Sequence, residues 1–249
     1  MTVLRGTCRL CREDRDLVES HILSAWVIRR VARIRSPTES RQAVEVWAGG
    51  EVVPQCAQLT EHLLCIACEG RIKKWEDRVA DVAVQTNGHF PALERARVLA
   101  EKGEVPCVDL GEEAARFPAS VFWRASVSTK YPDVSLGSYE ERFRRYLLSD
   151  SSDLGTARLV VNIIDHNDLA CVASHPHASN EGGYHLHQFT VPGLRFSLLV
   201  GARVPARFDA HCFFRTRGAW AIDGLDMVGM FADASRAGVA AGRLHARRR

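Results

Sequence analysis

Apolar residues recur at helical spacing in two segments of the N-terminal third of the chain. Residues 69–84 predict one amphipathic helix, because apolar side chains return every three or four positions, at Ile72, Trp75, Val79 and Val82. Residues 21–34, HILSAWVIRRVARI, predict a second helix, with Ser20 as its N-cap. Between these helices, VEVWAGGEVV alternates polar and apolar positions and is broken by two glycines, which predicts a β-hairpin.

The rest of the chain divides into a helical and a β-rich region. Three segments of residues 85–150 predict helices: PALERARVLAEKG, FPASVFWRASV and YEERFRRYLLSD. Short runs of β-branched and aromatic residues then predict strands: TARLVVNIID, LACVAS, YHLHQFTV, LRFSLLVG and DAHCFFRTR. Residues 226–249 predict a last helix with a frayed basic tail. We therefore predict an α+β fold in three regions, 1–84, 85–150 and an antiparallel β-rich 151–249.

Composition is typical of a protein with a sizeable core. The 249 residues are 46% hydrophobic and 25% charged, which allows one large domain or two smaller ones. The net charge of +3 does not by itself indicate a polyanionic partner. The chain has neither a signal-peptide-like start nor the roughly 20 apolar residues of a membrane span, so we predict a cytoplasmic protein without membrane association.

Four of the eight cysteines form two CxxC pairs, Cys8 with Cys11 and Cys65 with Cys68. Two such pairs can supply four thiolates to one tetrahedral Zn²⁺, with Zn–S bonds of about 2.3 Å. A site closed by four thiolates leaves no position for water, so this zinc would be structural. A turn with the first pair, a β-hairpin, and a helix supplying the second pair describe a treble-clef module with a long insertion. The other four cysteines are interpreted as packing residues.

The N-terminal third resembles the HNH nuclease superfamily in its four-cysteine form. The resemblance rests on the CxxC at 8–11, SHIL at 20–23, and LLCIAC at 63–68 before a helix, and it covers residues 5–84. It implies a ββα-metal-like treble clef in which His21 is the general base of phosphodiester hydrolysis. It also implies a bound Mg²⁺ or Mn²⁺ that stabilises charge on the leaving oxygen. The rest of the chain resembles uncharacterised bacterial proteins that carry the same module, and a role in bacterial defence follows by analogy alone.

The sequence departs from the family pattern at the positions that bind the catalytic cation. Ser20 stands where the family has a metal-binding Asp or His, and Glu69 stands where it has a His. Four nearby side chains could rebuild a site rich in oxygen ligands for Mg²⁺ or Mn²⁺: Glu19, Glu61, His62 and Glu69. His21 would then be a working base, a relic in a binding module, or a core histidine beside a helix cap.

Two functions therefore remain open. The first is a metal-dependent endonuclease acting on nucleic acid, with DNA favoured over RNA and phosphate contacts from Arg29, Arg30 and Arg33. The alternative is a catalytically inactive zinc-binding adaptor for nucleic acid or for a protein that docks on the C-terminal sheet. The convergence of a carboxylate and a second ligand near His21 would separate them.

A histidine-rich segment near residue 180 is a second candidate for metal chemistry. His185 and His187 alternate along a predicted strand, so both would face one side and could hold a metal together with His175 or His177. The alternative is an exposed strand face beside a mobile turn, suggested by Pro176 and the pair Gly182 and Gly183.

Overall fold

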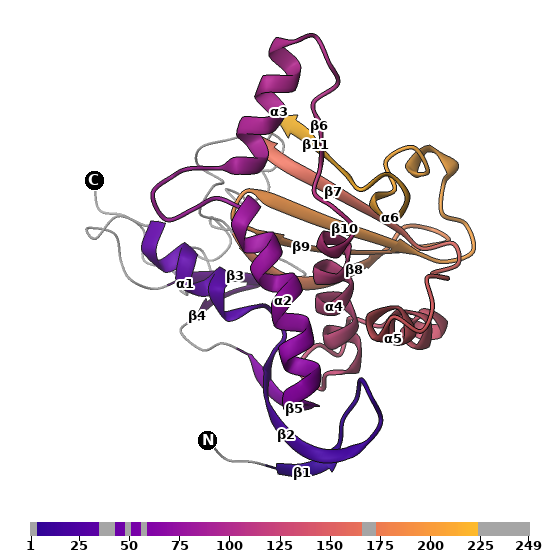
Figure 1. Ribbon diagram of the computed structural model, residues 1–249. Helices are drawn as coiled ribbons and strands as arrows, with labels where there is room; N and C mark the ends of the chain where they lie inside the picture. The colour runs from indigo at the N-terminus through magenta and orange to yellow at the C-terminus, as the bar shows by residue number, and fades with distance from the viewer. Residues whose placement is uncertain (1–3, 35–42, 48–50, 56–58, 166–172, 224–249) are drawn as a thin grey trace.

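The computed structural model describes residues 4–34, 43–47, 51–55, 59–165 and 173–223, and it has an α+β fold. Figure 1 shows a small sheet at one end of the molecule and a larger sheet with helices packed in front of it. The predicted α+β class is confirmed. The expected final helix at 226–249 and most of the strand expected in LACVAS lie outside the described residues.

The small sheet builds the N-terminal module. It has the order β1-β2-β5, with all pairs antiparallel, and comprises β1 (Leu4–Thr7), β2 (Asp14–His21) and β5 (Thr60–Cys65). Two helices follow its strands, α1 (Ala25–Ile34) and α2 (Ile66–Val82). The predicted hairpin is present as β3 (Ala43–Trp47) paired with β4 (Glu51–Gln55), although its two glycines, 49 and 50, lie outside the described residues.

The start of the first helix was predicted wrongly. Ser20 and His21 belong to β2, where they pair with Glu61 and Thr60, and α1 begins only at Ala25. Ser20 is therefore not a helix cap, and the amide of Val27 bonds the carbonyl of Ser24 in the first turn instead. Pairing with β5 satisfies the backbone of residues 20–21, an alternative that helical periodicity cannot reveal. The second helix, α2, contains the predicted buried stripe and begins three residues earlier than expected.

The larger sheet has six strands in the order β6-β11-β7-β10-β9-β8. These are β6 (Cys107–Asp109), β7 (Arg158–Asp165), β8 (Ser174–Asn180), β9 (His185–Val191), β10 (Leu194–Val200) and β11 (Gly218–Asp223). Its pairs are antiparallel except for the parallel pair of β7 and β11, so the predicted purely antiparallel arrangement is wrong at that point.

One local prediction in this region was also wrong, and one open alternative is decided. DAHCFFRTR, expected as a strand, folds into turns and the short helix α6 (Phe213–Thr216), after the 3₁₀ turn η3 (Ala206–Phe208). The strand comes next, as β11, because Arg217 adopts a positive φ of 57° that ends the helix and redirects the chain. HPHASN, for which Pro176 left a mobile turn as an alternative, forms the edge strand β8, a position where proline is tolerated.

Three helices of the middle region are those that the sequence predicts. They are α3 (Pro91–Glu101), α4 (Glu113–Val127) and α5 (Glu140–Leu148), the last preceded by the 3₁₀ turn η1 (Gly137–Tyr139). Figure 1 shows α2 and α4 side by side in front of the larger sheet, and the two helices contact each other.

One continuous hydrophobic cluster joins the three sequence regions. Phe117 of α4 lies at its centre, since its ring lies 6.3 Å from that of Trp26 and 5.8 and 5.6 Å from those of Phe189 and Phe196. The N-terminal module and the larger sheet therefore share a core through α4. No helix among the described residues has the length and apolar character to cross a membrane.

Candidate metal centre and the region around His21

The two CxxC pairs converge on one point. The ligand atoms of Cys8, Cys11, Cys65 and Cys68 all lie within 4.8 Å of one another, and the sulfurs of Cys11 and Cys65 are 4.0 Å apart. Tetrahedral zinc with bonds of about 2.3 Å requires sulfurs about 3.8 Å apart, close to that spacing. Three of the four side chains are buried. The cluster could thus hold a metal ion such as zinc with little movement.

Backbone geometry explains this convergence. The first pair lies in a tight turn in which the amide of Arg12 bonds the carbonyl of Cys8 at 2.8 Å, and Arg12 itself has a left-handed φ of 65°. Cys65 is the N-cap of α2, and Cys68 lies in the first turn of that helix. The amide of Cys65 donates to Sγ of Cys8 at 3.3 Å. Amides and a helix N-terminus favour thiolate, the form that binds metal.

The thiols of the cluster differ in pKa. A hydrogen bond from the Cys68 thiol lowers the pKa of Cys8 to about 4, and the same hydrogen bond raises the pKa of Cys68. The cluster therefore favours one thiolate that the neighbouring thiols and amides stabilise. A divalent cation would extend that stabilisation to all four sulfurs and release their protons.

The turn that carries the first cysteine pair is fixed to helix α5. Arg144 donates to the carbonyl of Leu10 at 2.7 Å and to Glu141 at 2.8 Å, and Arg12 binds the same Glu141 at 2.5 Å. The Arg144 side chain is 13% exposed, so this contact is partly shielded from water. Arg144 of α5 thus holds the turn with the first cysteine pair in place.

The residues predicted to surround a catalytic cation lie on both faces of the small sheet. Successive residues of a strand face opposite sides, so Glu19 and His21 lie on one side of β2 and Ser20 on the other. Glu19 is exposed, while His21 and His62 are half-buried. Within the part of the chain that the structure describes, the four cysteines are the only group of three or more Cys, His, Asp or Glu side chains whose ligand atoms, as they stand, all lie within 4.8 Å of one another.

Glu61 and Glu69 are hydrogen-bonded within the chain. Glu61 accepts bonds from the hydroxyl of Ser128 at 2.5 Å and from both the amide and the hydroxyl of Thr129, at 3.0 and 3.1 Å. Glu69 accepts a bond of 2.9 Å from the hydroxyl of Ser20. Burial raises the pKa of Glu69, against the opposing effects of Arg124 and of the Ser20 hydrogen bond.

A buried arginine lies next to this region, and sequence reasoning did not single it out. The Arg124 side chain is fully buried; it donates to the carbonyl of His21 at 2.6 Å and to Glu76 at 2.9 Å. Together, Arg124, Glu76, Glu69 and Ser20 form a polar group that we call the Arg124 network. The signal available in the sequence was an arginine inside the apolar stretch FPASVFWRASV, where charge is costly unless a partner is near.

The four histidines of the second candidate site are divided in the structure. His175 is buried, and its Nδ1 is hydrogen-bonded to the hydroxyl of Tyr131. Nδ1 of His177 lies 3.3 Å from the carbonyl of His175, so the ring is turned toward its own strand. His185 and His187 do share one face of β9, with ring centres 6.3 Å apart. The pair is therefore present, and the predicted third histidine does not join it.

Comparisons with known proteins add no relative to this description. Searches against protein-family models, against curated proteins and against solved structures found no significant match for this chain.

Proposed function

We propose that this chain is a zinc-stabilised, catalytically inactive binding protein whose N-terminal module is a treble clef. The observation that most supports this proposal is the Arg124 network. A guanidinium with no exposed surface lies against the carbonyl of His21 and against Glu76, beside the region where the family resemblance implies a catalytic cation. The four-cysteine zinc is structural in this proposal, since four thiolates leave no open coordination position.

Charge explains why the arginine argues against a second cation. Glu69 and Glu76 both interact with Arg124, so the guanidinium already offsets part of their negative charge within the protein. A Mg²⁺ ion placed beside Glu69 would be repelled by the guanidinium and would compete with Ser20 for the carboxylate. Glu61 already accepts three hydrogen bonds, which a metal would have to compete with for its two oxygens. Neither carboxylate is a ready ligand.

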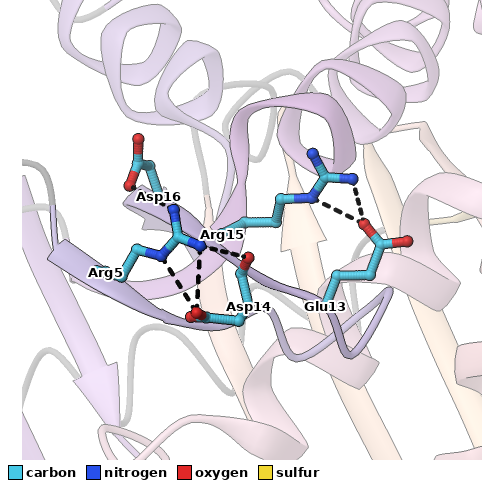
Figure 2. Close-up of polar contacts among 5 residues, drawn as sticks. All are labelled: Arg5, Glu13, Asp14, Arg15 and Asp16. Carbon is cyan, nitrogen blue, oxygen red and sulfur yellow. Dashed lines mark hydrogen bonds and ion pairs between the residues drawn. The ribbon is translucent and has the colours of Figure 1, made fainter.

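We propose a protein partner rather than nucleic acid, because several arginines of the module, among them Arg5, Arg15 and Arg30, have acidic or carbonyl partners in the chain. Figure 2 shows Arg5 between Asp14 and Asp16 on the small sheet, and Arg15 against Glu13, which directly precedes β2. Arg30, one of the three arginines predicted to contact phosphate, stacks on Trp26 and donates to the carbonyl of Ala80 at 2.8 Å. A polyanion needs cations that face outward without acidic neighbours. We retain the cytoplasm as the proposed location.

The endonuclease is the second candidate, and one specific contact favours it. Ser20 and Glu69 occupy the two positions where the family resemblance implies metal ligands, and their side chains meet at 2.9 Å. His21 follows Ser20 directly. Under this proposal, His21 is the base, and Glu69 holds a Mg²⁺ or Mn²⁺ together with Glu19, Glu61 or His62 after their present hydrogen bonds exchange.

Plasmid cleavage separates the two candidates. Supercoiled DNA is incubated with the zinc-loaded protein and Mg²⁺ or Mn²⁺, and wild type is compared with His21→Ala at equal zinc content. The binding-protein proposal expects no nicking in either protein. Cleavage by wild type that His21→Ala abolishes, with the zinc content unchanged, would establish the nuclease instead. His89→Ala, an exposed histidine of the segment before α3, is the matched control.

Nucleic-acid affinity tests the choice of partner. Fluorescence anisotropy with labelled duplex and single-stranded oligonucleotides is measured at low and at physiological salt. A protein-binding role predicts no salt-dependent association, because few phosphates would be neutralised. Binding that weakens steeply with salt and is lost in the double variant Arg29→Ala, Arg33→Ala would favour a nucleic-acid partner.

A further inference from the structure

A pocket of about 350 Å³ lies on the larger sheet, away from the cysteines, where β9 and the end of β10 face the segment at 133–139. Its polar lining comes from a loop, a 3₁₀ turn and a strand: Asp133, Ser135, Tyr139, His185 and His187. Neither the structural metal nor the region around His21 accounts for this pocket.

His187 is the unusual member of this lining. The residue has no exposed surface, and neither of its ring nitrogens has a hydrogen-bond partner among the described residues. One side of the ring faces the core, where it meets the edge of Phe122 at 6.1 Å between ring centres. Buried polar groups in folded proteins nearly always have a partner, because leaving one unsatisfied is costly. An unpartnered imidazole on a pocket wall therefore indicates a ligand that bonds to nitrogen.

His185 provides a second nitrogen ligand in the same place. It lies two residues from His187 on β9, so both side chains leave the strand on one face, with ring centres 6.3 Å apart. His185 is exposed, so its ring can turn toward the pocket without disturbing the core. Opposite His187 on the neighbouring strand β8 stands Ala178, a small side chain that leaves room beside the imidazole.

Asp133 adds an oxygen ligand from the opposite wall. Its side chain is exposed, it lines the same pocket, and it forms no ion pair with the residues that the structure describes. Two imidazoles and one carboxylate are a common ligand set for zinc and related first-row transition metals, and they leave coordination positions open. Mg²⁺ and Ca²⁺ prefer oxygen ligands, so two nitrogens argue against both.

We propose that His185, His187 and Asp133 bind one divalent first-row transition-metal ion of the Zn²⁺ type. His187 is the fixed ligand, and the two exposed side chains close on the metal when it arrives. Unlike the four-cysteine site, this site keeps an open position that faces the pocket. The proposal is independent of the proposed function, because it involves neither the N-terminal module nor the Arg124 network.

Metal titration of the zinc-loaded protein tests the proposal. Co²⁺ is added to the protein that already carries one zinc per chain, and visible absorption is recorded together with calorimetry. The proposal expects one further equivalent, with d–d bands and without the intense charge-transfer bands that cobalt bound to thiolate would give. Charge-transfer bands accompanying the binding would place the cobalt at the cysteines and overturn the proposal.

Variants of the two exposed ligands complete the test, since they do not alter the core. A residue that only hydrogen-bonds a metal ligand typically contributes roughly 10- to 100-fold to affinity. His185 is proposed to bind the metal itself, so His185→Ala should weaken Co²⁺ binding by more than that. Asp133→Asn should weaken binding by about 10-fold or more. His89→Ala is the control, because His89 also lies beside a carboxylate, 2.6 Å from Glu94, but does not line the pocket. Unchanged affinity in either ligand variant, or an equal loss in the control, would overturn the proposal.

Discussion

The four-cysteine cluster and the carboxylates near His21 are carried by neighbouring positions of the same strand and helix, but only the cysteine side chains come together at one point. Strand β5 and helix α2 carry members of both groups, and Cys68 is followed directly by Glu69. The sulfurs gather within 4.8 Å of one another. Glu61 and Glu69 instead bind hydroxyl and amide groups of the chain. Side chains that can bind a metal are available as ligands only where other groups of the protein do not already occupy them with hydrogen bonds.

The pKa values also separate the two groups: the pKa of Cys8 is lowered, whereas the pKa of Glu69 is raised. The Cys8 thiol has a lowered pKa because the Cys68 thiol and backbone amides donate to its sulfur. Glu69 has a raised pKa because the effect of burial outweighs those of Arg124 and of the Ser20 hydrogen bond, which both lower it. The fold thus favours the anionic form of a sulfur in the cluster and disfavours the anionic form of Glu69. A cation added to the protein gains most at the cysteines.

The largest effect should come from breaking the cluster. Cys65→Ser removes one ligand and the N-cap of α2, and structural zinc contributes about 10–16 kcal/mol of apparent binding free energy to folding. We expect loss of zinc and melting of the N-terminal module, measured by metal content and thermal unfolding. Cys107→Ser is the control, because Cys107 is a free cysteine outside the cluster. A Cys65→Ser protein with unchanged zinc content and melting temperature would contradict the four-cysteine assignment.

The next largest effect should come from the Arg124 network. Arg124→Met leaves Glu76 and Glu69 without their buried cation, and removing one partner of a buried pair costs about 3–5 kcal/mol. Urea denaturation of the zinc-loaded protein measures this loss.

A double variant distinguishes charge from packing. Arg124→Met combined with Glu76→Gln should recover part of the lost stability, since fewer carboxylates then remain unpaired. Full additivity of the two changes would mean that the arginine does not stabilise the acidic residues, and the argument against a catalytic cation would lose its basis.

These two regions also define what the sequence could predict. The spacing of the cysteines located the cluster, because a CxxC turn and a helix start are local structures. The periodicity of residues 69–84 located α2 for the same reason. By contrast, Ser20 looked like a helix cap but pairs in β2, since the decisive partner is Glu61 on a strand forty residues away.

The partners of the carboxylates could not be predicted. Ser128 and Thr129, which bind Glu61, come from the end of α4, and Arg124 comes from the same helix. Only the packing of α4 against α2 brings these groups to the N-terminal module. A single sequence gives the residue types that could bind a cation, whereas the tertiary contacts decide whether a cation is needed.

A smaller effect concerns the charge of Glu69. Its pKa in the folded protein is raised, so proton uptake stabilises the fold at low pH, and this contribution is lost as pH rises through the folded pKa. Glu69→Gln keeps an oxygen acceptor for Ser20 and removes the charge. We expect the stability of the variant relative to wild type to improve as pH rises above about 4.5, the unperturbed value.

Urea denaturation at about pH 5 and about pH 8 measures this difference, and titrations common to both proteins cancel. Glu19→Gln is the control, because Glu19 lies exposed on β2 close to the same site. A variant that becomes less stable than wild type with rising pH would mean that Glu69 is needed as an anion, as a metal ligand would be, and would favour the nuclease.

The smallest effect should come from the exposed ion pairs of Figure 2, which resemble the Arg124 network in chemistry but not in burial. The side chains of Arg5 and Asp14 are 67% and 64% exposed, with 3.2 Å between nitrogen and oxygen. Water screens such pairs, so Arg5→Ala should cost about 0.2–1 kcal/mol in urea denaturation. The coupling energy of a double-mutant cycle with Asp14→Ala should be no larger than this cost, because Arg5 also pairs with Asp16. A cost as large as that of Arg124→Met would show that burial is not what distinguishes the two arginines, and Arg124 would then say nothing special about the cation beside His21.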